Sequence, residues 1–255
     1  MVNDLILRTE QVLNIEAFIY KDIGVAPAVD ALKQSAIQMG YNPKYINALE
    51  LLNSGLKNAK LFIMPGGADL SYCQKLNGAG TRYIKDWVYN GGTYVGICAG
   101  AYFGSAYCEF DKGGKKEVTG VRELAFFPGK AVGPLFGEYS YASHQTAQTV
   151  CISFNGQKYT TYYNGGCKFV DASGYKNVKI LATYETGDAA VIEISHGKGK
   201  AILSGVHFEI TADYLKKETP KTQDESTRIQ KILNDIKDKK HLNVLSKILN
   251  KIEHK

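Results

Sequence analysis

The sequence predicts an α/β protein with a flavodoxin-like, doubly wound, mostly parallel sheet, an antiparallel extension of that sheet and C-terminal helices. Three observations support this fold class. Short apolar runs alternate with helical patterns as far as Ala106, a stretch rich in Gly, Tyr and Thr follows at residues 107–195, and a last apolar run at Ala201–Gly205 precedes two amphipathic segments. Strands that alternate with helices form parallel sheets through right-handed crossovers, whereas short strands joined by tight turns pair antiparallel.

The first half of the chain contains the elements of the parallel core. An apolar run at Asn14–Tyr20 predicts a buried first strand, and apolar residues at helical spacing predict a helix over Val25–Met39 that ends at Gly40. The segment Ala59–Met64 is almost continuously apolar, as in a parallel strand covered on both faces. The other elements expected here are a strand at Lys44–Asn47, a helix at Ala48–Leu56, a helix in at least the second half of Tyr72–Asn90 and a strand at Thr93–Ile97.

The second half contains the elements of the antiparallel extension. Asn155-Gly156 separates two strand-like runs, and this dipeptide is a strong signal for a two-residue hairpin turn. Phe127-Pro128-Gly129 and Gly133-Pro134 are expected to mark an ordered loop. The expected strands are Val118–Val121, Thr149–Phe154, Lys158–Tyr163, Lys179–Tyr184 and Ala189–Ile194, followed by the parallel strand Ala201–Gly205 and by helices at Thr222–Lys237 and His241–Ile252.

We therefore expect one domain over residues 1–215 and an amphipathic helical appendage over residues 216–255. The net charge of +6 over 255 residues is concentrated in the lysine-rich C-terminal tail, and no arginine-rich stripe interleaved with aromatic residues occurs. A charged tail of this kind is usually a solvated helix face, so we expect no nucleic-acid partner.

The cysteines bear on the cellular compartment and on metal binding. The chain has five of them, an odd number without CxxC spacing, which argues against a disulfide framework and against a structural zinc site. No run has the length and character of a signal peptide or of a membrane-spanning helix. We expect a cytoplasmic protein that has no membrane partner, no metal and no cofactor.

The segment Gly91–Gly104, GGTYVGICAGAYFG, is the most informative stretch of the sequence. An apolar strand runs directly into Cys98, small residues flank this cysteine, and a helix-compatible run follows. Small neighbours allow the tight strand-to-helix turn that exposes a nucleophile above a sheet edge, so Cys98 is the candidate nucleophile. A nearby imidazole and the positive end of the next helix would both favour the reactive thiolate. The alternative is a buried structural cysteine.

A histidine and an acid follow the last predicted parallel strand. His207 and Glu209 are two residues apart at the end of this strand, and so can supply a base and the group that orients it. Together with Cys98 they form a catalytic triad by role. Among the other histidines, His144 competes best, because its aromatic and glycine-rich surroundings could overhang the same site.

Two glycine-containing segments supply the remaining candidate site residues. The turn Pro65–Asp69 can aim backbone N–H groups at a developing oxyanion, although it can equally be a tight connection in which Asp69 caps a helix. The segment Tyr162–Cys167 suggests an aromatic pocket wall or, alternatively, a packed hairpin. The candidates are Gly66, Gly67, Ala68 and Ala99 for the oxyanion, and Tyr163, Asn164 and Gly165 for the substrate.

These motifs resemble the class I glutamine amidotransferase-like superfamily. The set is most similar to the amidotransferase-like domain found at the N-terminus of eukaryotic biotin–protein ligases and as free-standing bacterial proteins. The resemblance spans most of residues 13–215 and rests on FIMPGGADLSY (62–72), GGTYVGICAGAYFG (91–104), YYNGGCKFVDA (162–172) and GKGKAILSGVHFE (197–209). It implies a flavodoxin-like fold and a Cys-His-Glu site.

The chain also departs from the superfamily pattern. Glutamine amidotransferases usually carry a His-Gln pair after the nucleophile, where the Gln helps to bind glutamine; Ala101-Tyr102 stands there, which makes Tyr102 a further candidate substrate residue. Phe208 replaces the usual proline between the histidine and the glutamate. Neither departure damages the triad chemistry, but the first counts against glutamine as substrate. No synthetase or ligase domain follows in this chain, so an ammonia acceptor would have to be a partner protein.

Three functional hypotheses remain open from the sequence. The first is a cysteine-dependent hydrolase or amidotransferase-like protein that acts on a small amide through a thioester. The second is a non-catalytic module that binds a small amide or carboxylate ligand in the same pocket. The third is a redox protein that oxidises Cys98 reversibly, although no acid precedes the turn to assist a sulfenate. An unreactive Cys98 would distinguish the second from the first.

Overall fold

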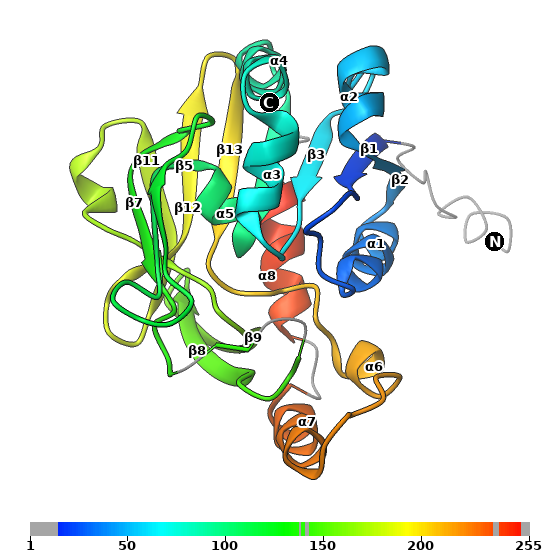
Figure 1. Ribbon diagram of the computed structural model, residues 1–255, viewed down its shortest axis with the longest axis vertical. Coiled ribbons are helices and arrows are strands. Elements are labelled where there is room, and N and C mark those ends of the chain that lie inside the picture. Colours follow the sequence, from blue (N-terminus) through cyan, green and yellow to red (C-terminus); the bar gives the residue numbers. More distant parts are fainter. Residues whose placement is uncertain (1–14, 138, 141–142, 237–239, 251–255) are drawn as a thin grey trace, which may run out of the picture.

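The computed structural model describes residues 15–137, 139–140, 143–236 and 240–250 (Figure 1). Within these residues, thirteen strands form one continuous sheet. The parallel core has the spatial order β2-β1-β3-β4-β13 and confirms the predicted fold class. Its strands are β1 (Ile15–Tyr20), β2 (Tyr41–Ile46), β3 (Leu61–Met64), β4 (Thr93–Ile97) and β13 (Gly199–Ser204).

Two apolar layers cover the two faces of this core. Phe62, Tyr94 and Leu203 point from β3, β4 and β13 into one layer, which α2 (Ala48–Ser54), α3 (Asp69–Leu76), α4 (Ala79–Tyr89) and α5 (Ala99–Phe103) complete. Their neighbours Ile63 and Val95 point into the other layer, with α1 (Val29–Gln38) and α8 (Lys240–Asn250). Side chains alternate between the faces of a strand, and burial on both faces explains why β3 is wholly apolar and β4 nearly so.

The second half extends the sheet, as predicted, largely with antiparallel pairs. β12 (Ala189–His196) pairs with β13, and the sheet continues through β10 (Lys168–Phe169), β7 (Phe127–Gly133), β5 (Ser105–Phe110) and β6 (Val118–Val121). A branch from β12 contains β11 (Val178–Tyr184), β8 (Gln148–Phe154) and β9 (Gln157–Tyr163). The predicted hairpin joins β8 to β9, and positive φ angles of 49° at Asn155 and 75° at Gly156 fit a primed turn.

Several elements differ from the sequence-based expectation. The segment expected to be a loop at Phe127–Pro134 contains β7, which pairs parallel with the equally unpredicted β5. Pro128 and the glycines of β7 obscured its strand pattern, since these residues usually mark turns. The helix expected in at least the second half of Tyr72–Asn90 is present as α4, and α3 precedes it; the two are separated at Asn77-Gly78, where Gly78 has φ 82°. The first helix of the chain begins at Val29 rather than Val25, because Val25 forms a bridge with Gly67.

The C-terminal segment contains α6 (Ala212–Leu215), α7 (Gln223–Asp235) and α8, and the predicted ends at Lys237 and Ile252 lie outside the described residues. In Figure 1, α8 lies behind the sheet, on the side opposite α3 and α4. Val244 and Leu245 of α8 are buried in the same apolar layer as Val95 of β4. We propose that α8 belongs to the same folding unit as the sheet, rather than to a separate appendage.

Candidate active site

Cys98 occupies the turn between β4 and α5. Its φ of 51° and ψ of −106° place a non-glycine residue in a backbone region that L-amino acids avoid. The surroundings require small neighbours, because a Cβ on Gly96 would lie 2.3 Å from the Gly100 carbonyl oxygen. A Cβ on Gly100 would lie 2.1 Å from the Met64 carbonyl oxygen. The turn therefore has the strained strand-to-helix geometry that the sequence predicts.

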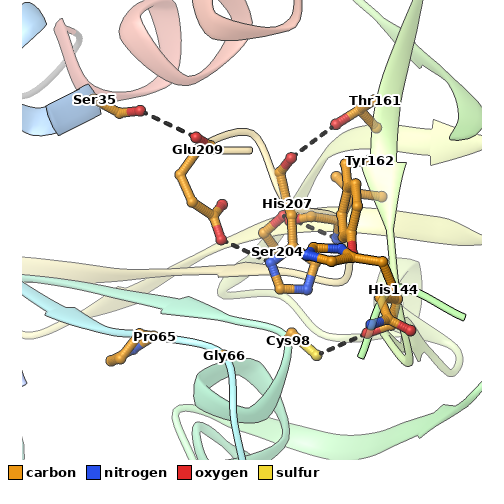
Figure 2. Close-up of polar contacts among 12 residues, drawn as sticks. Ser35, Pro65, Gly66, Cys98, His144, Thr161, Tyr162, Ser204, His207 and Glu209 are labelled. Carbon is orange, nitrogen blue, oxygen red and sulfur yellow. Dashed lines mark hydrogen bonds and ion pairs between the residues drawn. The ribbon is translucent and has the colours of Figure 1, made fainter. Parts of the chain in front are cut away.

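His207 and Glu209 follow β13, the neighbour of β4. His207 Nδ1 lies 2.7 Å from Glu209 Oε1, and the two residues are only 8% and 4% exposed. The main chain around them is held from both sides, since Thr161 Oγ1 donates to the His207 carbonyl oxygen (3.2 Å) and Ser35 Oγ donates to that of Glu209 (3.4 Å) (Figure 2). The pair is thus buried and fixed in one arrangement.

The parallel pairing of β4 with β13 brings the histidine to the cysteine. The Cys98 backbone N–H donates to the Ser204 carbonyl oxygen (2.8 Å), and Figure 2 shows the His207 ring facing Cys98. Gly66 lies between them, because a Cβ there would be 2.9 Å from His207 Cε1 and 3.7 Å from Cys98 Cβ. The Cys98 thiol donates to the Asn164 carbonyl oxygen (3.6 Å), and His207 Nε2 makes no hydrogen bond of regular geometry within the described residues.

The environment of His207 favours its protonated form. Burial lowers the pKa of this imidazole, but the charge of Glu209 and the nearby Cys98 thiol outweigh burial and raise the pKa to about 10, from an ordinary value of 6.5. A proton that leaves the thiol would therefore find an acceptor that holds it strongly.

Tyr162 and His144 form a second layer of contacts behind His207. The Tyr162 ring packs edge-on against the His207 ring at 5.6 Å between centroids, and its carbonyl oxygen accepts the His207 N–H (3.0 Å). The Tyr162 hydroxyl lies 2.8 Å from His144 Nδ1, and Glu225 of α7 accepts the His144 backbone N–H (2.8 Å). His144 thus reaches the site through Tyr162 (Figure 2).

The candidate oxyanion residues differ in what their N–H groups do. The Ala68 N–H is already bonded to the Gly24 carbonyl oxygen (2.8 Å). The N–H groups of Gly67 and Ala99 have no hydrogen-bond partner within the described part of the chain, and both residues line a pocket beside Cys98. Gly67 has φ 149°, and a Cβ there would lie 1.9 Å from the Gly24 carbonyl oxygen, so only glycine fits.

The pocket beside Cys98 encloses about 410 Å³ of empty space, part of it open to solvent. Of the candidate substrate residues, Tyr102 and Gly165 line it, whereas Asn164 touches the thiol and Tyr163 is buried behind, where its hydroxyl donates to the Gly166 carbonyl oxygen (2.7 Å). Its other walls could not be singled out from the sequence, and three of them come from segments distant from the motifs. These walls are Asp69 and Leu70 of α3, together with Phe110 of β5, Val118 of β6 and Tyr139 from the distant segments.

Comparison with known proteins places this geometry in a family. The model of the family described as biotin-protein ligase, N terminal, matches residues 17–255. The chain belongs to this family. The biotin–protein ligase of Schizosaccharomyces pombe is 39% identical over 183 residues, which cover 67% of this chain and 28% of that ligase. An uncharacterised protein of Chlamydia muridarum is 31% identical over 249 residues, which cover 92% of this chain and 96% of its relative.

Solved structures confirm the amidotransferase-like fold of this family member. A glutamine amidotransferase from Thermotoga maritima has a TM-score of 0.62 at 12% identity, with 95% of this chain and 99% of that chain covered. PurLQS from the same organism has a TM-score of 0.56 at 15% identity, and the match covers 87% of this chain and 98% of that chain. Identities this low show the fold alone. Within the described residues, none of the helices is long and apolar enough to span a membrane.

Proposed function

We propose that this member of the biotin–protein ligase N-terminal family is a cysteine-dependent hydrolase or amidotransferase-like enzyme that acts on a small amide. The observation that carries the proposal is the strained turn at Cys98, which faces the buried His207–Glu209 pair. A nucleophile, a base and an orienting acid in this order support acyl transfer through a thioester.

The proposed reaction begins with the Cys98 proton already held by His207, as the raised pKa of the imidazole favours, and the thiolate attacks the amide carbonyl carbon. Among the residues that the structure describes, the N–H groups of Gly67 and Ala99 have no partner, and so are suited to hold the oxyanion. His207 then returns the proton to the leaving amine or ammonia as the C–N bond breaks. Water, activated by His207, hydrolyses the thioester and releases a carboxylic acid, while Glu209 keeps the ring oriented throughout.

A second candidate function is a non-catalytic, ligand-binding or regulatory module with the same fold. The contact between the Cys98 thiol and the Asn164 carbonyl oxygen favours it, because the thiol is then engaged by the protein's own backbone rather than presented to a substrate. The Ala101-Tyr102 pair also favours it, since it replaces residues that help to bind glutamine in the resembling enzymes.

Incubation with a panel of primary amides distinguishes these candidates. We expect release of ammonia and an acyl adduct on Cys98, detected by mass spectrometry of the intact protein and of its peptides. Cys98→Ala is expected to lose both signals, whereas Cys151→Ala, a half-buried cysteine on β8, is expected to keep them. A ligand that raises the melting temperature without adduct or turnover would instead support the binding module.

A further inference from the structure

The pocket beside Cys98 has an unusual combination of walls. Asp69 is the only charged side chain among the described residues that line it. Three of the other lining residues are aromatic: Tyr102, Phe110 and Tyr139. The Tyr102 and Phe110 rings lie 5.7 Å apart at 82°, and the Phe110 and Tyr139 rings lie 5.3 Å apart at 89°. The pocket thus has successive perpendicular aromatic walls and one carboxylate.

Arg122 fixes the carboxylate without entering the pocket. Its Nε donates to Asp69 Oδ2 (2.7 Å), and its Nη1 donates to the carbonyl oxygens of Gly120 and Val121 (3.1 and 3.0 Å). The Arg122 side chain is 3% exposed and does not line the pocket, so the guanidinium lies behind the carboxylate. Burial and the Asp69 charge raise the pKa of the neighbouring Cys108 thiol, which therefore adds no negative charge of its own. Of the two partners of the ion pair, only Asp69 lines the pocket.

Aromatic faces combined with a carboxylate are a recognition site for organic cations, because the negative faces of the rings attract an ammonium group. Lys116 donates to the Tyr139 carbonyl oxygen, and its Nζ lies 5.9 Å from the Tyr139 ring centroid, but Lys116 does not line the pocket. None of the described lining residues carries a positive charge, so a substrate carboxylate would find no cationic side chain among them.

We propose that this pocket binds an organic ammonium group, so that the substrate is a cationic amide without a free carboxylate. The inference rests on the proposed function, since it takes Cys98 as the nucleophile that attacks this amide. It excludes free glutamine as the preferred substrate, because the carboxylate of glutamine would face Asp69 and the aromatic rings unpaired.

Charged thiol reagents test this inference directly. Three methanethiosulfonates carry a trimethylammonium-ethyl, a sulfonatoethyl or an uncharged methyl group; the thiolate attacks their sulfenyl sulfur and methanesulfinate leaves. With rates normalised to the uncharged reagent, we expect Cys98 to prefer the cationic over the anionic reagent by about tenfold or more, relative to Cys151 in the same protein.

Variants show which groups produce the preference. Asp69→Asn is expected to reduce it several-fold, and Tyr139→Leu is expected to reduce it as well. Because Asp69→Asn leaves Arg122 buried without its ion-pair partner, the double variant Asp69→Asn/Arg122→Gln removes both charges together. Asp188→Asn is the matched control, because Asp188 pairs with Lys168 outside the pocket; it is expected to leave the preference unchanged.

The outcomes separate the two proposals. If the uncharged reagent labels Cys98 rapidly but Cys98 shows no more cation preference than Cys151, the cationic pocket is wrong and the proposed nucleophile stands. If the uncharged reagent labels Cys98 no faster than the buried Cys108 and Cys167, the proposed function fails and this inference fails with it.

Discussion

Gly100→Ala is expected to lower the free energy of unfolding by about 3 kcal/mol. Gly100 is the second residue of α5, where helix propensity alone would make alanine the better residue by about 1 kcal/mol. The new Cβ would, however, lie 2.1 Å from the Met64 carbonyl oxygen, which belongs to the backbone of β3 and cannot move aside independently. Steric overlap therefore predicts a lower free energy of unfolding and helix propensity a higher one, and the overlap is the larger effect.

Urea unfolding of the wild type and the variant measures this difference. Gly174→Ala is the matched control, because nothing lies within 4 Å of its Cβ position and its φ is not positive; we expect a change below about 0.5 kcal/mol there. A Gly100→Ala variant as stable as the wild type would show that α5 does not pack against β3 as closely as described, and the geometry of the Cys98 turn would have to be revised.

Glu209→Gln is expected to cost about 3–5 kcal/mol of stability near pH 6, because it leaves a buried imidazolium without its carboxylate. The pKa of His207 is raised from 6.5 to about 10 in the folded protein, so the folded state binds this proton more tightly than the unfolded state. The resulting stabilisation is complete below about pH 6.5 and is lost as the pH rises through about 10. The variant should therefore approach the wild type at high pH.

Unfolding curves measured between pH 6 and pH 10 give this profile. Glu193→Gln serves as control, because the Glu193 carboxylate also pairs with a cation, Lys200 (2.9 Å), but is partly exposed; its loss should cost less than about 1 kcal/mol. If the free energies of unfolding of Glu209→Gln and the wild type differed by the same amount at every pH in this range, the raised pKa at His207 would be contradicted.

Local patterns were sufficient to predict the parallel core and the three residues at its carboxyl edge. β3 is wholly apolar, β4 is nearly so, and the buried part of β13 contains an apolar run at residues 201–203. Cys98 directly follows β4, and His207 lies three residues after the end of β13. Because β4 and β13 are neighbours in a parallel sheet, the residues that follow them lie together at one edge. The placement of the two side chains thus follows from strand order alone.

The pocket walls could not be predicted in this way. Asp69 and Arg122 are 53 positions apart, and their pairing depends on where β6 meets α3. Phe110 belongs to β5, whose pairing partner β7 contains a proline and glycines that resemble a turn. The contact of Tyr162 with His207 depends in the same way on β9, which reaches the site through the branch of the sheet. Long-range pairing of irregular strands leaves no local signal.

The central claim is that His207 activates Cys98, and iodoacetamide labelling tests it most directly. The other four cysteines are internal references, because burial raises the pKa of each of them, to about 11 for Cys73. At about pH 6.5, Cys98 is expected to react at least about tenfold faster than these references, and His207→Ala is expected to remove the advantage.

His196→Ala is the control for the loss of an imidazole, since His196 packs against Tyr89 and Phe126 and leaves the Cys98 site untouched. Peptide mass mapping over a pH series gives the labelling rate at each cysteine. Fast labelling of Cys98 that depends on His207 and not on His196 is the predicted result. Labelling of Cys98 no faster than that of the references, or indifferent to His207→Ala, would contradict the account.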